Sequence, residues 1–545
     1  MSHNETKPGW PQRIIGWSVF LVLLAILAWF VANLLPAQPR SSFELPRAEK
    51  LEFLCDDGRS LVTLSGQMET FWGPVQIWDT NTGRCRYRYK DSNFVIDQYK
   101  FSPDYRFLAI ADSEGILHLL DFQNNGERMQ SDFEDVAALE LTFSPRGKYL
   151  LVRDSQNLHD SCLMETNTGA IRHKFKAIVD FHFFSQNDEV FVFFIGPAHP
   201  VLLGLDENGT GICDLQSRKP MQVLKETTPI ALAPDGRHLL AWKDGKAILW
   251  NIPAAKPAAL SFEKEPLSAL FSPDSSILAT RNDLGRPVEF WNHKNDNCEV
   301  AFWDVITGQL LGKPVRVPSF YKASWSPNSK ALLLSDLGPF MLLDSQGIRW
   351  QRESDLWQTF DDARFFLAND SWLLVGRNST FRKYEDSKHE YEVIDLLTGT
   401  TRTTIKVDPP FPSVGALSSN GRYLAVFEET IEEPDFLARI LEKLWPKNAK
   451  PKEQVRVIDV ASGKRIASVP AKKFTDENGI PHLPQCLVSQ DGQTLIVANP
   501  QEDRWLVQCW TIPPHPPLTW VVGPPLGILF LAVVGCRFKR RRNLN

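Results

Sequence analysis

A tight turn between two apolar segments recurs along this chain, and this recurrence restricts the possible folds more than any other feature. In its clearest copy, Pro234-Asp235-Gly236 separates two short apolar runs, and a third run, residues 247–250, follows closely. Proline fixes φ and Asp-Gly provides turn chemistry, so the segment reads as three short antiparallel strands.

Ten copies align on the apolar residue that starts the turn: Leu54, Phe101, Phe143, Phe184, Leu232, Phe271, Trp325, Phe366, Leu417 and Val488. Eight of the nine successive spacings lie between 39 and 54 residues, and the last is 71. A four-stranded propeller blade takes about 40–50 residues. The spacing therefore predicts an all-β propeller, with insertions in the longer units.

The third strand of many units ends in an apolar residue and an acid, as in Ile77-Trp78-Asp79 and Phe302-Trp303-Asp304. Several of these units continue into Thr-Gly or Ser-Gly, for example Thr398-Gly399. Glycine accepts the positive φ that a tight hairpin needs before an outer strand begins.

With these motifs the chain resembles WD40-repeat β-propellers of the divergent bacterial type, over residues 41–512. The Trp-Asp dipeptide is present in two units and the family's Gly-His dipeptide in none. The resemblance implies about 8–10 four-stranded blades, and the missing dipeptide implies loss of the buried Asp-His-Ser-Trp network. One ring of ten blades, two rings, and eight blades with two misread units are the alternatives.

The last unit has a third strand, residues 505–510, but no outer strand after it. An additional extended segment, Ser41 to Leu45, precedes the first unit. We expect this segment to provide the missing outer strand and close the ring, which protects its edges.

Residues 14–35 are uncharged, with Trp17 and Trp29 near the two ends. This length suits a transmembrane helix. A cleaved signal peptide is the alternative, but its apolar region is shorter, and the exit at Leu35-Pro36-Ala37 is a poor cleavage site. Residues 1–13 would then be a short cytoplasmic N-terminus.

Residues 518–536 form a second uncharged stretch, after a Pro-rich spacer at 513–517. A basic tail, 537–545, follows, with Arg537, Lys539, Arg540, Arg541 and Arg542. Basic residues remain on the cytoplasmic side. We therefore expect a bacterial inner-membrane protein with its propeller on the periplasmic side. Processing at a C-terminal sorting signal is the alternative, although no sorting motif precedes Leu518.

Insertions interrupt the connections between second and third strands, which we expect on the face away from the membrane. The candidate partner-binding residues in two of them are Arg286, Trp291, Phe381, Arg382 and Tyr384. The longest insertion contains a predicted helix, residues 434–445, with Pro434 at its start. Its candidate contacts are Phe436, Leu437, Ile440, Leu441 and Trp445. Packing of this helix on the propeller rim is the competing interpretation.

No nucleophile elbow, zinc-protease motif or phosphate-binding loop is present in the sequence. The eight dispersed cysteines lack metal-ligand spacing, and we expect most of them to be buried apolar residues. The net charge of −5, without a basic stripe, argues against a nucleic-acid partner. We expect a scaffold that binds protein partners and the bilayer, without catalysis, cofactor or metal. A hydrolase- or lyase-type enzyme in the central channel and an envelope-transport accessory protein are the alternatives.

Overall fold

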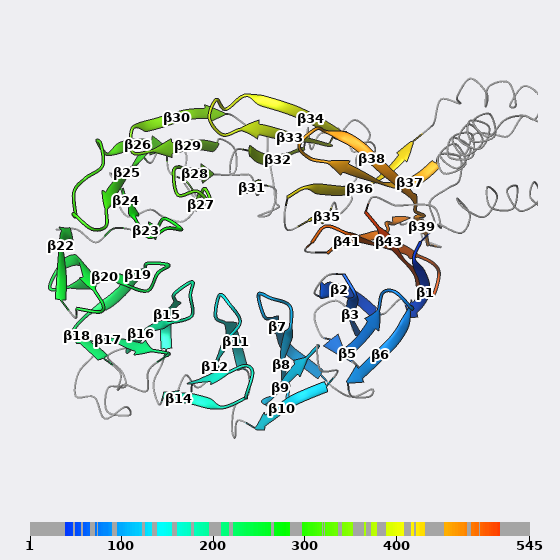
Figure 1. Ribbon diagram of the computed structural model, residues 1–545, viewed down its shortest axis with the longest axis horizontal. Coiled ribbons are helices and arrows are strands. Elements are labelled where there is room, and N and C mark those ends of the chain that lie inside the picture. Colours follow the sequence, from blue (N-terminus) through cyan, green and yellow to red (C-terminus); the bar gives the residue numbers. More distant parts are fainter. Residues whose placement is uncertain are drawn as a thin grey trace, which may run out of the picture.

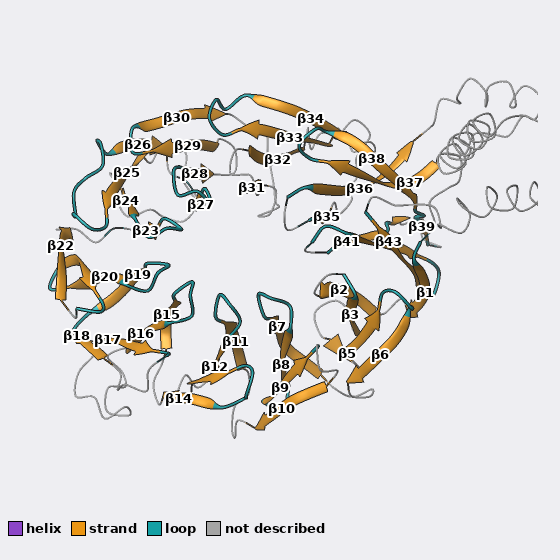
Figure 2. Ribbon diagram, in the orientation of Figure 1, coloured by secondary structure: helices purple, strands orange, loops and turns teal. Residues whose placement is uncertain are grey.

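The computed structural model describes residues 39–512, apart from several connecting segments. The longest of these segments are 196–208, 284–296, 353–363, 379–388, 408–415 and 431–451. The described part is built of strands, turns and loops (Figure 2). It contains no helix with the length and apolar character that crossing a membrane requires. The predicted spans 14–35 and 518–536, the spacer and tail, and the predicted helix 434–445 all lie outside the described residues.

Ten antiparallel sheets follow one another around a ring (Figure 1). Blade 1 consists of β2 (Glu49–Cys55), β3 (Ser60–Ser65), β5 (Val75–Asp79) and β6 (Arg84–Tyr89). Blade 2 consists of β7 (Val95–Phe101), β8 (Phe107–Asp112), β9 (Ile116–Asp121) and β10 (Gly126–Asp132), with β4 (Phe71–Trp72) added beside β7. Blade 3 consists of β11 (Leu139–Phe143), β12 (Tyr149–Asp154), β13 (Ser161–Glu165) and β14 (Ile171–Phe175).

The next four blades have the same order. Blade 4 consists of β15 (Val179–Phe184), β16 (Val190–Ile195), β17 (Gly209–Asp214) and β18 (Gln222–Lys225). Blade 5 consists of β19 (Thr228–Leu232), β20 (His238–Lys243), β21 (Lys246–Asn251) and β22 (Lys256–Phe262). Blade 6 consists of β23 (Ser268–Phe271), β24 (Ile277–Asp283), β25 (Asn297–Asp304) and β26 (Val315–Pro318). Blade 7 consists of β27 (Lys322–Trp325), β28 (Leu332–Ser335), β29 (Phe340–Asp344) and β30 (Gly347–Arg352).

The last three blades complete the ring. Blade 8 consists of β31 (Arg364–Phe366), β32 (Trp372–Asn378), β33 (His389–Asp395) and β34 (Thr401–Val407). Blade 9 consists of β35 (Ala416–Leu417), β36 (Tyr423–Thr430), β37 (Lys452–Asp459) and β38 (Lys464–Pro470). Blade 10 consists of β41 (Gln485–Val488), β42 (Thr494–Pro500), β43 (Arg504–Thr511) and β1 (Ser41–Pro46). Between blades 9 and 10, β39 (Phe474–Thr475) pairs with β40 (Pro481–His482).

The apolar side chains between neighbouring blades show why the ring is continuous. Side chains alternate across a strand, so on β8 Leu108 and Ile110 pack toward blade 1, whereas Phe107 and Ala109 pack toward blade 3. Among the described residues, one buried cluster spans each of the ten blade boundaries, including the boundary between blades 10 and 1. The structure is therefore one closed ring of ten blades, and neither eight blades nor two rings.

The N-terminal strand closes the ring, as the sequence predicts. Strand β1 pairs antiparallel with β43, with Ser41 opposite Cys509 and Leu45 opposite Trp505. Leu45 is 1% exposed and lies in the cluster between blades 10 and 1. The Phe43 ring stacks on the Trp78 indole of blade 1, with ring centroids 5.2 Å apart.

The two faces of the ring follow from strand register. In blade 3, Tyr149 starts the second strand and pairs with Glu165, which ends the third. The turns between first and second strands and between third and outer strands therefore share one face, which we name the turn face. The connections from second to third strand, and from blade to blade, lie on the opposite face, which we name the loop face.

Candidate functional site

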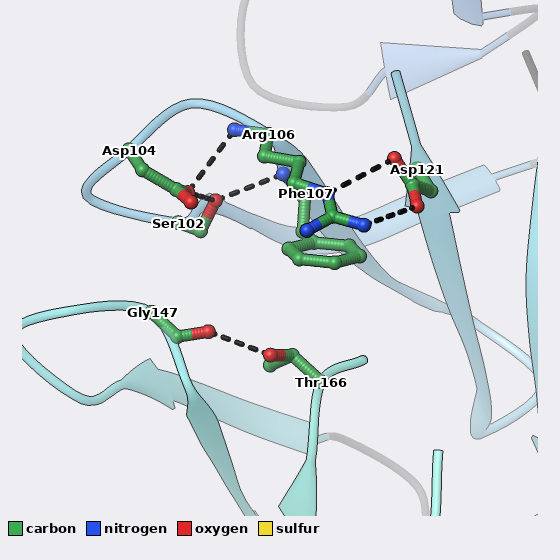
Figure 3. Close-up of polar contacts among 7 residues, drawn as sticks. All are labelled: Ser102, Asp104, Arg106, Phe107, Asp121, Gly147 and Thr166. Carbon is green, nitrogen blue, oxygen red and sulfur yellow. Dashed lines mark hydrogen bonds and ion pairs between the residues drawn. The ribbon is translucent and has the colours of Figure 1, made fainter. Parts of the chain in front are cut away.

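Serine side chains organise the turn between the first and second strands. In blade 2, the Ser102 hydroxyl accepts a 2.8 Å hydrogen bond from the Phe107 amide and donates to the Asp104 carboxylate at 2.5 Å (Figure 3). The Arg106 guanidinium reaches the Asp121 carboxylate at 3.2 Å and so joins both turns of this blade. The serine-to-amide bond recurs in six other blades, at Ser144, Ser185, Ser272, Ser326, Ser418 and Ser489.

The fourth residue of this turn has positive φ, as at Gly147 and Gly236. In blades 4, 6 and 7 this residue is polar rather than glycine, and its side chain bonds to the preceding blade. Asp188 accepts the Ser144 hydroxyl at 2.6 Å, Ser275 accepts the Asp235 amide at 3.0 Å, and Ser329 accepts the Asp274 amide at 3.0 Å.

The Gln186 amide donates to the Pro234 carbonyl at 2.7 Å, which joins blade 4 to blade 5. Together with the three side-chain contacts, this bond makes a continuous series of turn-to-turn hydrogen bonds from blade 3 to blade 7. This part of the turn face is therefore a connected, inflexible surface.

The third-to-outer-strand turns are capped by the acid that ends the third strand. The Asp304 carboxylate accepts the Thr307 amide at 2.7 Å, the Thr307 hydroxyl at 2.8 Å and the Ile306 amide at 3.1 Å. These bonds, first the one from the Thr307 amide, lower the pKa of Asp304. Gly308 has φ 69° and closes the turn. Asp79, Asp395 and Asp459 cap equivalent turns.

Within a blade, the two kinds of turn are hydrogen bonded to each other. In blade 3, the Thr166 hydroxyl donates to the Gly147 carbonyl at 2.6 Å (Figure 3). In blade 1, the Thr80 hydroxyl donates to the Gly58 carbonyl at 2.5 Å. The turn face is thus braced both within and between blades.

Both ends of the described chain meet the turn face. The Arg40 guanidinium donates to the Thr80 hydroxyl at 2.9 Å in the outer turn of blade 1. At the other end, the Ile512 amide donates to the Gln493 carbonyl of the blade 10 turn at 2.7 Å. Arg40 and Ile512, at the two ends of the described chain, therefore lie at the turn face.

The loop face has the longest connections between second and third strands. Strands β16 and β17 are joined by 196–208, β24 and β25 by 284–296, β32 and β33 by 379–388, and β36 and β37 by 431–451. The last three of these segments contain all the predicted partner-binding residues, from Arg286 to Trp445, and lie outside the described residues. The predicted membrane-flank residues Trp17, Trp29 and the basic cluster 537–542 also lie outside them. The role of the partner-binding residues stays a prediction, and the strands that flank their segments begin or end on the loop face.

A buried polar chain, missed in the sequence, joins blades 1 and 2 near the loop face. The Tyr89 hydroxyl lies 2.6 Å from Nδ1 of His118, and Nε2 of His118 lies 2.8 Å from the Asp112 carboxylate. His118 is 0% exposed. Because no substrate reaches a fully buried imidazole, we assign this chain to the joint between the blades. Its one sequence signal is a histidine within an apolar strand, six residues after an acid.

Each of the two Trp-Asp units contains a hydrogen bond that was not predicted from the sequence. The Trp78 indole donates to the Thr63 hydroxyl at 3.1 Å, and the Trp303 indole donates to the Thr280 hydroxyl at 3.0 Å. These second-to-third-strand bonds need no Gly-His dipeptide, because both partners belong to one blade. In the two units that contain Trp-Asp, these bonds therefore join the second strand to the third.

The described residues hold few groups suited to covalent or metal chemistry. No three His, Cys, Asp or Glu side chains among them lie close enough to hold a metal ion. Burial raises the pKa of Cys213 and Cys486 to about 12, and that of Cys509 to about 11. A thiol is a nucleophile only when ionised. Of the six cysteines whose side chains the structure describes, Cys85 is exposed and the other five are buried, which agrees with the expectation that most of them are buried.

No protein family and no curated protein matches the sequence. Solved structures resemble parts of the ring. An initiation factor of eukaryotes is 14% identical, with a TM-score of 0.42 over 73% of this chain and 90% of that chain. The dihydro-heme d1 dehydrogenase NirN is 13% identical, with a TM-score of 0.36 over 79% and 78%. KlHsv2 with a replaced loop is 11% identical, with a TM-score of 0.30 over 62% and 93%. Identities this low carry no inference about ligand or activity.

Proposed function

We propose that this chain is a membrane-anchored β-propeller that acts as a protein-interaction scaffold on the non-cytoplasmic side of the bilayer. One observation carries the proposal. Both ends of the described chain start from the turn face, whereas the long second-to-third-strand connections belong to the loop face. Anchors at both ends hold the turn face toward the membrane and leave the loop face directed away from it.

The construction of the ring suits a binding role. The first-to-second-strand turns, of about four to six residues, are fixed by the serine bonds and the contacts between blades. Recognition on rigid scaffolds is commonly carried by the longer loops. The proposed partner contact within 431–451 is the stripe formed by Phe436, Leu437, Ile440, Leu441 and Leu444.

Photocrosslinking in intact cells tests this role. We place benzoylphenylalanine at Trp445 and compare the crosslinked proteins with and without Phe436→Asp and Leu441→Asp. The proposal expects discrete adducts that the double variant abolishes. A matched turn-face variant, Asn167→Asp, should leave the adducts unchanged. Identical adducts in the double variant would exclude the apolar stripe as the docking element.

Protease treatment of spheroplasts tests the orientation independently. The proposal expects digestion of the ring from outside, since residues 37–517 are placed beyond the cytoplasmic membrane. Full protection in intact spheroplasts, with digestion only after lysis, would contradict it.

A further inference from the structure

Exposed apolar side chains are concentrated on one part of the ring. Among the described residues, seven large apolar side chains are highly exposed, and six of them belong to blades 6–9. One of the six, Leu270, lies in the innermost strand of blade 6, and the other five lie near the outer strands. We name these five the apolar arc: Ile306 (82% exposed), Leu310 (38%), Ile348 (43%), Leu397 (74%) and Ile466 (37%). Each lies in a third-to-outer-strand connection or within the first three residues of the outer strand, and hence at the outer rim of the turn face.

The two most exposed residues of the apolar arc lie in turns that are fixed by hydrogen bonds. Ile306 and Leu397 occupy the same position, two residues after the capping acids Asp304 and Asp395. The equivalent residues of blades 1 and 3 are Asn81 and Asn167. The turn backbone itself requires no apolar residue there, because Asp79 forms the same bonds with the Asn81 and Thr82 amides. The local fold of these turns therefore does not explain why Ile306 and Leu397 are apolar.

Basic side chains accompany the apolar arc. Lys313, Arg349, Lys464 and Arg465 are exposed in the same connections and outer strands of blades 6, 7 and 9. Four carboxylates lie on the same rim: Asp304, Asp395 and Asp459 accept the hydrogen bonds that cap the turns, and Asp344 forms an ion pair with Arg349. Lys313, Lys464 and Arg465 are therefore the basic side chains that this rim offers to an anionic surface. Apolar side chains flanked by Lys and Arg are the combination that binds the interface of an anionic bilayer.

We propose that the apolar arc rests on the surface of an anionic lipid bilayer and inserts Ile306 and Leu397 between the headgroups. The inference deepens the proposed function and rests on its anchoring of the turn face toward the membrane. The chain ends lie at blades 10 and 1, at the right of Figure 1, whereas blades 6–9 form its upper side. Contact at the arc as well as at the anchors would prevent a ring held at one edge from tilting away from the bilayer.

Lipid photocrosslinking of the full chain tests this contact. The chain is reconstituted in vesicles of phosphatidylcholine with phosphatidylglycerol, with benzoylphenylalanine at Ile306, Leu397, Asn81 or Asn167 in turn. Lipid adducts are measured by mass spectrometry. We expect adduct yields roughly ten-fold higher at Ile306 and Leu397 than at the two asparagine positions, since only the former reach the acyl boundary. Equal yields at all four turns would overturn the proposal.

A comparison that varies the lipid and protein charges, together with a flotation assay, completes the test. Vesicles of phosphatidylcholine alone, or the variant Lys464→Glu with Arg465→Glu, should lower the yields at Ile306 and Leu397 several-fold. Yields independent of lipid charge and of this variant would refute the basic contribution. A chain that floats with the vesicles but gives no adducts refutes the arc alone, whereas a chain that does not float refutes the anchoring and the arc together.

Discussion

The Asp188 carboxylate in the turn of blade 4 accepts a 2.6 Å hydrogen bond from the Ser144 hydroxyl in the turn of blade 3. The same carboxylate accepts the amides of Arg146 at 3.1 Å and Lys148 at 3.2 Å. One side chain in a left-handed position, with φ 58°, thus satisfies three donors of the neighbouring blade. The contact shows how residues far apart in the sequence set the spacing of adjacent blades.

Replacing Asp188 should destabilise the ring. Asp188→Gly removes the carboxylate and relieves the positive φ, so any loss of stability reports the contact between blades. We expect the free energy of unfolding to fall by about 1–3 kcal/mol, because three donors lose their acceptor. Chemical denaturation measures this decrease. The free energy of unfolding should decrease less in Asp188→Asn, because asparagine keeps one acceptor oxygen. A stability of Asp188→Gly equal to wild type would show that the contact is energetically neutral.

Gly399, in the outer turn of blade 8, and Gly245, in the hairpin between the second and third strands of blade 5, form a matched pair of glycines with positive φ. Gly399 has φ 69°, and an added Cβ would lie 2.5 Å from Cγ of Trp350 in the preceding blade. Gly245 has φ 75°, with nothing within 4 Å of its added Cβ. Gly245→Ala should cost about 1–2 kcal/mol for the left-handed backbone alone. Gly399→Ala should lower the free energy of unfolding clearly more, since Trp350 is also displaced. Equal melting temperatures for the two variants would contradict this packing.

His182 should make stability depend on pH. Burial, followed by the nearby Arg153 charge, lowers the pKa of His182 from 6.5 to about 4. Between these values the unfolded chain binds a proton that the folded chain does not, so stability falls as pH decreases from 6.5 toward 4. The loss attributable to His182 should reach about 2–3 kcal/mol. In His182→Gln this part of the acid destabilisation should disappear, whereas an unchanged pH profile of unfolding would exclude it.

Local turn chemistry made the blades and the closing strand predictable from the sequence. Phe101 and Phe271 end their innermost strands as expected, and Gly83, Gly169, Gly308, Gly399 and Gly463 have the positive φ assigned to them. The contacts of Asp188 and His118 were not predictable, because their partners Ser144 and Tyr89 are set by the stacking of blades. The exposure of Ile306 was missed for a similar reason. An apolar residue beside Val305 reads as core, yet Val305 is 1% exposed and Ile306 is 82% exposed.

The number of rings, like the contacts of Asp188, could be determined only from packing between blades and not from local turn chemistry. Ten turns were visible in the sequence, but turns alone do not separate one ring from two. The buried clusters between blades do, because the last of them joins Leu45 and Trp505 of blade 10 to Leu61 of blade 1. The candidate contacts at Phe436, Leu441 and Trp445 stay predictions that rest on an amphipathic stripe.

The orientation on which the proposed function rests requires that the ring closes through β1, since closure places both chain ends on the turn face. Ser41 lies opposite Cys509 in this pair. Directly opposed antiparallel residues lie within disulfide range. The most direct test is mass spectrometry of the oxidised Ser41→Cys variant. The account predicts a single new disulfide between position 41 and Cys509. A Cys509 that stays free after oxidation, or a disulfide between position 41 and the exposed Cys85, would contradict it.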